Sequence, residues 1–503
     1  MKITVNHRSQ TPIYRQIKNQ IKEMILKEEL QDGSALPSER VMARIADVHR
    51  NTIIKAYNEL KADGLISASQ GKGYRVTYRI MDELDLSQNE TNKKEEEQKK
   101  NESILWSHLI RQPVLDLETT FDDLFSRSYD NGNISFAGGI AAPESYYGAD
   151  LGLILEKLIA DSKESKDDLY AYTPYQGLFE LRQAISVFLQ GKGINARHGE
   201  IQIVSETNQA IDYLTELFIE EGDVVITEEP ISPDVFRELR LAGAKVITVP
   251  MDEEGMLTDC IEPLIVKYHP KFIYANSSYH DPTGIIMSLR RRKALLKLSY
   301  RYQVPIIEDD GASEICYQQN QTPSLKALDT CNSVIYIYSF ALTFAPGIRL
   351  AFVVAPRVVI KNLSHLISLR LISFDSLSQR LLCTYMKNGM YQKNLKSICV
   401  DYRKKRDRMC ECLGAAEKLG VEFKKPEGGV YIWCKLPETM NLNHLLTLAG
   451  KKGVTFIPGG VFFPYGTKGE QYIRLNYSYP GLEQIEKGMG VLLEAMEQSL
   501  EKD

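Results

Sequence analysis

The chain has 503 residues, of which 43% are hydrophobic and 25% are charged. At roughly 100–200 residues per domain, this length predicts more than one domain, and the ordinary composition excludes a wholly disordered or fibrous chain. No apolar run approaches the roughly 18 residues of a membrane span, and the first residues lack the apolar core of a signal peptide. The eight cysteines form no C-x-x-C pair, which indicates reduced thiols in a cytosolic protein and no metal site.

The net charge of −5 hides an asymmetry. Residues 1–80 carry 14 Lys and Arg against 8 Asp and Glu, a net charge of +6, so the remaining residues carry −11. A basic head on an acidic body indicates a polyanionic partner for the head alone, although chance surface variation would also produce an excess of this size.

Elements of a small DNA-binding module follow one another in the basic head. Ile13, Ile17, Ile21 and Ile25 recur at helical spacing. Ser38 is a suitable N-cap for a short second helix. Residues 50–63 predict a third helix, with Ile53, Tyr57 and Leu60 facing inward and Arg50, Thr52 and Lys55 facing outward.

Two β-rich runs around the glycine-flanked tip QGKG then predict a hairpin. Three helices followed by a hairpin form a winged helix-turn-helix, which sets its third helix into a major groove of DNA. Lys72 at the tip of the hairpin is expected to reach the DNA backbone or the minor groove.

The run LPSERVMARIADVHRNTIIKAYNELKADGLISASQGKGYRV closely resembles the GntR family of bacterial transcription regulators. Its L-P-S-x-R, R-N-T and G-x-G motifs are matched at Leu36–Arg40, Arg50–Thr52 and Gly71–Gly73. One departure is His49, where that family usually has a serine cap. The resemblance implies that the operator DNA is contacted by Arg40, Arg50, Asn51, Thr52, Lys55 and Lys72.

The next segment, MDELDLSQNETNKKEEEQKKNES, is almost entirely polar and cannot bury enough apolar surface to offset its ordering entropy. It predicts a mobile tether, and the more apolar residues 104–128 are expected to dock onto the body. The predicted domains are therefore 1–80 for the winged helix-turn-helix, 81–128 for the linker and docking segment, 129–390 for a large domain and 391–503 for a small C-terminal subdomain.

From about residue 130, short β-branched runs alternate with helical stretches. The runs are IQIV, DVVIT, KVITV, KFIYA, PIIED, VIYIY and RLAFVV. This alternation predicts an α/β domain with a mainly parallel sheet covered on both faces, followed by a smaller α+β region.

The motifs YTPYQGLFELRQAI, VSETNQAIDYL, EEPISPDVFREL, YHDPTG, IIEDDGASE, FALTFAPGIRLAF and YIRLNYS resemble, in that order, those of fold-type I aminotransferases. Their fusion to a GntR head resembles the MocR subgroup of regulators. The resemblance implies a fold-type I aminotransferase-like body that forms a homodimer.

Pyridoxal phosphate chemistry needs a lysine amine for the Schiff base. In the family that lysine lies in S-K-T-x-A-P-G-x-R, and the corresponding run is FALTFAPGIR. The resemblance therefore places Leu342 at the lysine position and Ala341 at the serine before it. Leucine has no amine, so no internal aldimine is expected.

Four other cofactor contacts depart from the family pattern in the same way. Asp281 replaces an asparagine that donates to the phenolic oxygen of the cofactor, and an ionised Asp can only accept hydrogen bonds. Gly311 replaces a tyrosine that donates to the same oxygen. Glu206 replaces a glycine beside the phosphate, next to Thr207 at a helix start. Ser232 replaces an aromatic that stacks on the ring.

Some family positions are retained: Asp309 at the ring nitrogen, Arg349 at the phosphate, Arg474 at the substrate carboxylate and Tyr172 toward a neighbouring subunit. Ordinary ion pairing, such as a strand-end network between Arg349 and Asp309, is the alternative reading. The effector or vestigial cofactor pocket is predicted to contain Tyr172, Glu206, Thr207, Asp281, Asp309, Leu342, Arg349 and Arg474.

These features predict a cytoplasmic, homodimeric transcription regulator that binds an operator with two half-sites. Its body is expected to be a pseudoenzyme without pyridoxal phosphate that senses a small amino acid or amine. Two alternatives stay open: a body that still binds the cofactor noncovalently or transaminates, and a ligand-free dimerisation scaffold.

Overall fold

A computed structural model describes most of the chain. The described residues are 3–5, 13–26, 30, 34–46, 48–62, 65–69, 73–76, 109–111, 114, 124, 132–147, 151–164, 169–318, 321–465 and 468–500. They belong to two compact units, Met1–Leu105 and Trp106–Asp503, which we call the head and the body. Most of the predicted linker, 81–128, lies outside the described residues.

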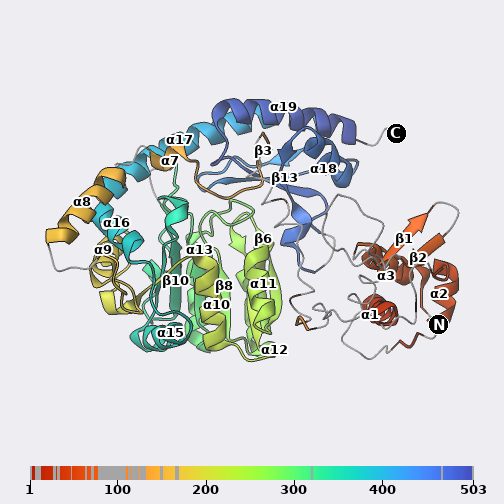
Figure 1. The fold of residues 1–503 in the computed structure, drawn as a ribbon, viewed down its shortest axis with the longest axis horizontal. Helices are drawn as coiled ribbons and strands as arrows, with labels where there is room; N and C mark the ends of the chain where they lie inside the picture. Colours follow the sequence, from red (N-terminus) through yellow and green to blue (C-terminus); the bar gives the residue numbers. More distant parts are fainter. Residues whose placement is uncertain are drawn as a thin grey trace, which may run out of the picture. The chain divides into compact units, whose positions relative to one another are not determined.

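The head contains the three helices and the hairpin that the sequence predicts (Figure 1). The helices are α1 (Ile13–Leu26), α2 (Glu39–Ile45) and α3 (Arg50–Ala62), and β1 (Ile66–Ser69) pairs antiparallel with β2 (Gly73–Val76). The predicted inward-facing residues are buried in one apolar cluster: Ile17, Ile21, Ile25, Ile53, Tyr57 and Leu60.

The start of α2 differs from the prediction in one detail. Ser38 precedes the helix, but its side chain makes no cap hydrogen bond. Its backbone carbonyl instead accepts from the Met42 amide at 2.8 Å, so Ser38 contributes a main-chain hydrogen bond and no side-chain bond to the start of the helix.

The larger part of the body is built on an eight-stranded sheet. In spatial order its strands are β4 (Ile201–Val204), β11 (Ala351–Val354), β10 (Val334–Ser339), β9 (Ile306–Asp309), β8 (Phe272–Ala275), β5 (Val224–Glu229), β6 (Lys245–Asp252) and β7 (Gly255–Met256). β10, β9, β8, β5 and β6 run parallel, whereas β11 and β7 are antiparallel to their neighbours. The prediction of a mainly parallel sheet is confirmed.

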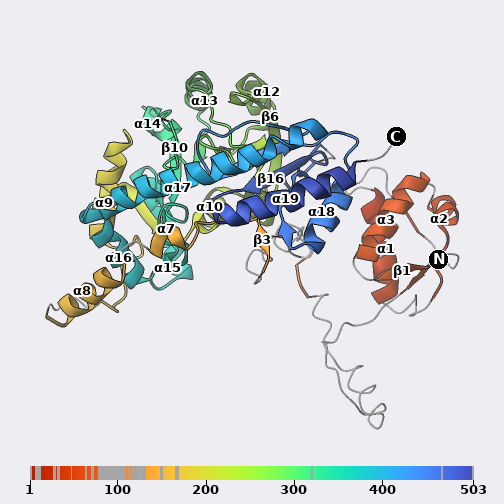
Figure 2. The same cartoon turned by 90° about the horizontal axis from the view of Figure 1, so that it is seen from above.

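Helices cover both faces of this sheet, because successive strand residues such as Val225 and Ile226 point to opposite sides. One face packs against α10 (Thr207–Phe218), α11 (Pro233–Leu241) and α15 (Arg357–Arg370). The other face packs against α12 (Ile261–Tyr268) and α13 (Leu289–Tyr302). Figure 2 shows α12 and α13 on the side of the sheet opposite α10 and α15.

The remaining helices of the larger part are α7 (Glu144–Tyr147), α8 (Leu151–Glu164), α9 (Phe179–Gly191), α14 (Leu325–Leu328) and α16 (Ser376–Lys387). Short 3₁₀ turns lie at His198–Glu200, Thr258–Cys260, Pro346–Ile348, Ala416–Leu419 and Gly459–Phe462. Within the described residues, no helix combines the length and the apolar character that crossing a membrane requires.

The small subdomain has a four-stranded antiparallel sheet. Its strands, in spatial order, are β12 (Glu422–Phe423), β13 (Tyr431–Lys435), β16 (Tyr472–Asn476) and β15 (Ile457–Pro458). The helices α17 (Met390–Leu413), α18 (Leu442–Lys451) and α19 (Leu482–Ser499) complete it.

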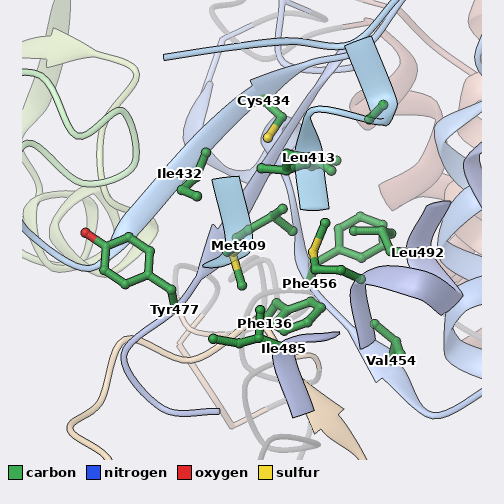
Figure 3. Packing of buried hydrophobic residues seen from close by; sticks show 14 of the residues in the cluster. Phe136, Met409, Leu413, Ile432, Cys434, Val454, Phe456, Tyr477, Ile485 and Leu492 are labelled. Atoms are coloured by element: carbon green, nitrogen blue, oxygen red, sulfur yellow. The ribbon is translucent and has the colours of Figure 1, made fainter. Parts of the chain in front are cut away.

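A segment from far upstream joins this subdomain. β3 (Ile134–Ser135) pairs in parallel with β14 (Val454–Thr455), and Phe136 is buried in the same core as Ile485 of α19 (Figure 3). The sequence-based division assigned residues from 129 onward to the large domain, yet this strand adds to the small one. Local patterning does not reveal a pairing between residues about 320 positions apart.

This packing can be tested on α19. A Cβ added at Gly488 would lie 2.6 Å from Phe136 Cζ and 2.7 Å from Ile134 Cγ2, whereas nothing lies within 4 Å of a Cβ at Gly490. We expect Gly488→Ala to lower the free energy of unfolding by about 1–3 kcal/mol through overpacking. Gly490→Ala should raise it by about 0.5–1 kcal/mol through better helix propensity. Urea unfolding followed by tryptophan fluorescence measures both, and equal effects would contradict the packing of β3 against α19.

Candidate functional site

The head exposes polar side chains of α3. Arg50 at the start of the helix and Lys55 one turn later are exposed, and Thr52 is half-buried. Ile53 and Tyr57 of the same helix are fully buried. The exposed side chains of Arg50 and Lys55 are therefore accessible to a partner.

Arg50 is held at the junction of α2, α3 and the hairpin. Its Nη2 lies 2.7 Å from Glu39 Oε2, and the Tyr74 hydroxyl of β2 donates to Glu39 Oε1 at 2.9 Å. The Arg50 side chain is still 49% exposed. Glu39 therefore orients the guanidinium without burying it, which leaves donors for a phosphate or a guanine.

Of the other predicted DNA contacts, the structure describes the side chain of Lys55 but not those of Arg40, Asn51 and Lys72. Lys55 Nζ lies 4.2 Å from the centroid of the Tyr14 ring of α1, a cation–π arrangement on an exposed face. Arg40 and Asn51 lie on α2 and α3, but their side chains are outside the described residues, as is Lys72.

In the body, a cavity of about 240 Å³ opens where β5, β8, β9 and β10 end. The carboxyl edge of parallel strands is where α/β proteins bind ligands, because the loops that follow the strands converge there. The cavity is lined by Gly139, Thr207, Asn208, Glu228, Ile231, Ser232, Asp234, Val235, Tyr274, Asn276, Tyr279, His280, Asp281, Asp309, Gly311, Ala312, Ser339, Ala341, Leu342 and Tyr431.

Asp309 ends β9 and lies in the cavity wall. Its Oδ2 accepts from the Tyr274 hydroxyl at 2.8 Å. Burial raises the pKa of Asp309 to about 7, although the bond from Tyr274 acts in the opposite direction. The predicted alternative, a network between Asp309 and Arg349, is not formed, since Arg349 pairs with Glu206 instead.

Asp281 forms an ion pair with Arg474. Arg474 Nη1 lies 2.7 Å from Asp281 Oδ1, and Nη2 donates to the Ala137 carbonyl at 2.8 Å. The guanidinium lies 4.3 Å from the centroid of the Tyr431 ring, and the side chain is only 1% exposed. This ion pair joins β16 of the small subdomain to the loop after β8 of the large sheet.

Glu206 and Arg349 form a second ion pair nearer the surface. Glu206 is the N-cap residue of α10, but its side chain makes no cap hydrogen bond. Thr207, the first residue of α10, lines the cavity, whereas Glu206, Arg349 and Arg474 do not belong to the lining.

Leu342 and Ala341 line the cavity in the loop after β10. Among the described residues of the lining there is neither a lysine nor an arginine. Tyr172 does not belong to the lining and is 79% exposed. The structure therefore brings four of the predicted pocket residues into the wall: Thr207, Asp281, Asp309 and Leu342.

Sequence reasoning missed Glu228, His280 and Asn276. Glu228 is fully buried, its Oε1 lies 3.4 Å from His280 Nε2, and its Oε2 has no hydrogen-bond partner among the described residues. Burial raises the pKa of Glu228 to about 8 and lowers that of His280 to about 3. An acidic residue at the carboxyl end of a β-branched run was the available signal for Glu228.

Asn276 positions the two aspartates of the cavity. Its Nδ2 donates to the Asp309 carbonyl at 3.0 Å, and its Oδ1 accepts from the Asp281 amide at 3.0 Å. Because both ends of the amide are engaged, the loop after β8 is tied to the end of β9.

Two family models match the chain. "Bacterial regulatory proteins, gntR family" matches residues 13–76, and "Aminotransferase class I and II" matches residues 145–491. These matches cover the head and most of the body, and they confirm the predicted winged helix-turn-helix and fold-type I aminotransferase-like body.

Two relatives share both parts. "Uncharacterized HTH-type transcriptional regulator YdfD" of Bacillus subtilis (strain 168) is 30% identical over 482 residues, which is 95% of each chain. "HTH-type transcriptional regulator NorG" of Staphylococcus aureus (strain USA300) is 28% identical over 464 residues, which is 90% of this chain and 97% of that protein.

The body is also similar to a solved structure. LysN, an alpha-aminoadipate aminotransferase from Thermus thermophilus, has a TM-score of 0.72 and 28% identity over 78% of this chain and 99% of that one. That structure is a complex with N-(5'-phosphopyridoxyl)-L-leucine. The chain belongs to the gntR family of bacterial regulatory proteins and, within it, to the MocR-type regulators, in which a DNA-binding head precedes an aminotransferase class I and II domain.

Proposed function

We propose that this DNA-binding transcription regulator uses its aminotransferase-like body for dimerisation and effector sensing, without Schiff-base chemistry. The observation that carries the proposal is the cavity wall, where Leu342 occupies the position that the resemblance assigns to the lysine. No lysine is among the described residues of the lining, so no amine there would form an imine.

The charges around the cavity support the same proposal. The phosphate of the cofactor is a dianion, and the resemblance assigns it to Arg349, which pairs with Glu206. Asp281 accepts from Arg474, so it offers a phenolate a negative charge rather than a donor. These residues do not fit pyridoxal phosphate, and this misfit argues against both a transaminase and a regulator that holds the cofactor noncovalently.

An effector role is favoured over a ligand-free scaffold by Glu228. A buried polar atom without a partner costs free energy, and the unpartnered Oε2 belongs to a residue that lines the cavity. A ligand that donates a hydrogen bond there would remove this cost. Such a ligand would alter DNA binding only if two states of the protein bind it with different affinity.

We place the dimer interface around the segment that contains Tyr172. Tyr170 and Tyr172 are 74% and 79% exposed, and Leu153 of α8 and Val187 of α9 are also exposed. α8 and α9 both pack on α16 (Figure 1), so these apolar side chains lie in one region of the body. A dimer would present two heads to an operator with two half-sites in the bacterial cytoplasm.

The first prediction concerns Arg50. Because its guanidinium is exposed and oriented by Glu39, Arg50→Ala should weaken operator binding about 10-fold or more. Fluorescence anisotropy of the full-length protein on an operator selected from random DNA measures this affinity. Arg15→Ala, which removes an exposed arginine of α1, is the matched control and should change the affinity less than about 3-fold. Equal affinities of Arg50→Ala and wild type would remove Arg50 from the interface.

The second prediction concerns the cofactor. Protein saturated with pyridoxal phosphate and then dialysed should keep no pyridoxal absorbance, and borohydride should fix no adduct on any lysine, because the described residues of the cavity wall include no lysine. Absorption spectra and peptide mass spectrometry measure both results. Leu342→Lys is the matched variant that supplies an amine, and it shows whether a fixed adduct is detectable. A reducible imine in the wild type would overturn the pseudoenzyme proposal.

The third prediction concerns assembly. Charges at Tyr170 and Tyr172 should oppose burial of this surface, so the double variant Tyr170→Asp, Tyr172→Asp should dissociate at least about 10-fold more readily than wild type. Analytical ultracentrifugation measures the dissociation constant. Val266→Asp is the control, since Val266 is an exposed apolar residue on α12, away from α8 and α9. A wild-type monomer, or an unchanged double variant, would contradict the proposed interface.

A further inference from the structure

Carboxyl groups dominate the ionisable side chains that line the cavity. Four belong to the lining: Glu228, Asp234, Asp281 and Asp309. No lysine or arginine accompanies them within the described lining, and the imidazole of His280 is neutral near pH 7 because burial lowers its pKa to about 3. Burial raises the pKa of Glu228 to about 8 and that of Asp309 to about 7, so a cationic ligand would stabilise the ionised form of both groups near neutral pH.

The two arginines that the resemblance assigns to anionic groups already have acidic partners within the chain. Arg474 Nη1 lies 2.7 Å from Asp281 Oδ1, and its Nη2 donates to a backbone carbonyl. Arg349 pairs with Glu206. A ligand carboxylate would have to displace Asp281 from a buried guanidinium and leave one of the two acids unpaired. Such displacement is costly where water is excluded.

One buried carboxyl oxygen in the lining has no hydrogen-bond partner among the described residues. Glu228 is fully buried, and its Oε2 has no hydrogen-bond partner among the described residues although the residue lines the cavity. Asp309 ends β9, which is separated from β5 by β8, and its Oδ2 accepts the 2.8 Å bond from Tyr274. An ammonium carries three donors and no acceptor, so it matches acidic groups of this kind.

The walls between these acids add the apolar surface that an organic cation requires. Tyr274, Tyr279 and Tyr431 all belong to the lining, together with Ile231 and Leu342. Aromatic faces attract cations most strongly when water is excluded. The volume of about 240 Å³ limits the occupant to a small molecule.

We propose that the cavity binds a small organic amine that carries neither a carboxylate nor a phosphate. Asp281 pairs with Arg474 in place of the carboxylate that a ligand would otherwise supply. The ammonium group is recognised by Glu228 and Asp309. This inference rests on the proposed effector-sensing function and narrows its ligand from amino acids and amines to amines alone.

The experiment compares amines with amino acids that differ only by the carboxylate. The probes are putrescine and ornithine, agmatine and arginine, and tyramine and tyrosine, titrated calorimetrically into the full-length protein. We expect at least one amine to bind at least about 10-fold more tightly than its amino acid. That amine should also raise the melting temperature, because it binds only the folded state.

Variants locate the binding. Glu228→Gln should weaken the binding of the amine with the highest affinity at least about 10-fold, because it removes the acidic group that would bind the ammonium. Glu229→Gln is the matched control, since the neighbouring Glu229 pairs with Lys468 and does not line the cavity. It should change the affinity less than about 2-fold. Asp281→Asn leaves Arg474 without its acid and should shift the preference at least about 10-fold toward the amino acid. Circular dichroism and analytical ultracentrifugation verify that each variant is folded and keeps the assembly state of the wild type.

The outcomes separate this inference from the function on which it rests. If the amino acids bind as tightly as the amines, the effector role stands and the amine assignment is wrong. Binding by none of the six probes overturns the amine assignment, and the effector role then depends on other ligands. A pyridoxal imine on a lysine of the wild type would overturn both. An amine that binds equally well to Glu228→Gln would exclude this cavity as its site.

Discussion

The ion pair between Arg474 and Asp281 is the interaction on which the body depends most. It joins the small subdomain sheet to the edge of the large sheet, and the guanidinium is almost fully buried. A buried arginine needs an acidic partner, and Asp281 supplies it from within the chain. The same contact places Asp281 in the cavity wall and neutralises the charge of Arg474. It therefore affects both the junction of the subdomains and the chemistry of the cavity.

The parallel strands of the large sheet bring acidic residues together at one edge. Glu228 lies near the end of β5, Asp309 ends β9, and Asp281 follows β8, so their positions converge although they are up to 81 residues apart in the chain. Burial raises the pKa values of Glu228 and Asp309 toward neutrality. The fold thus gathers carboxyl groups from distant parts of the chain at the edge of the sheet where the cavity opens.

Sequence reasoning was effective where the information is local. The apolar spacing of α1 and α3, the hairpin and the β-branched strands all predicted the observed elements, because each depends on periodicities of a few residues. It also brought Asp281, Asp309 and Leu342 into one pocket through motif order. It missed Glu228, whose role depends on burial, and the pairing of β3 with β14, which depends on distant parts of the chain.

By itself, the sequence determined the family, the two-part organisation and the identity of the residue at each motif position, since these follow from residue type and order. Only the tertiary structure decided how the charges are partnered. It paired Arg474 with Asp281 and Arg349 with Glu206 rather than with Asp309. It also buried Glu228 with one oxygen that has no partner among the described residues. The physical reason is that an ion pair needs approach within a few ångströms, and residues distant in the chain come that close only when the fold brings their segments together.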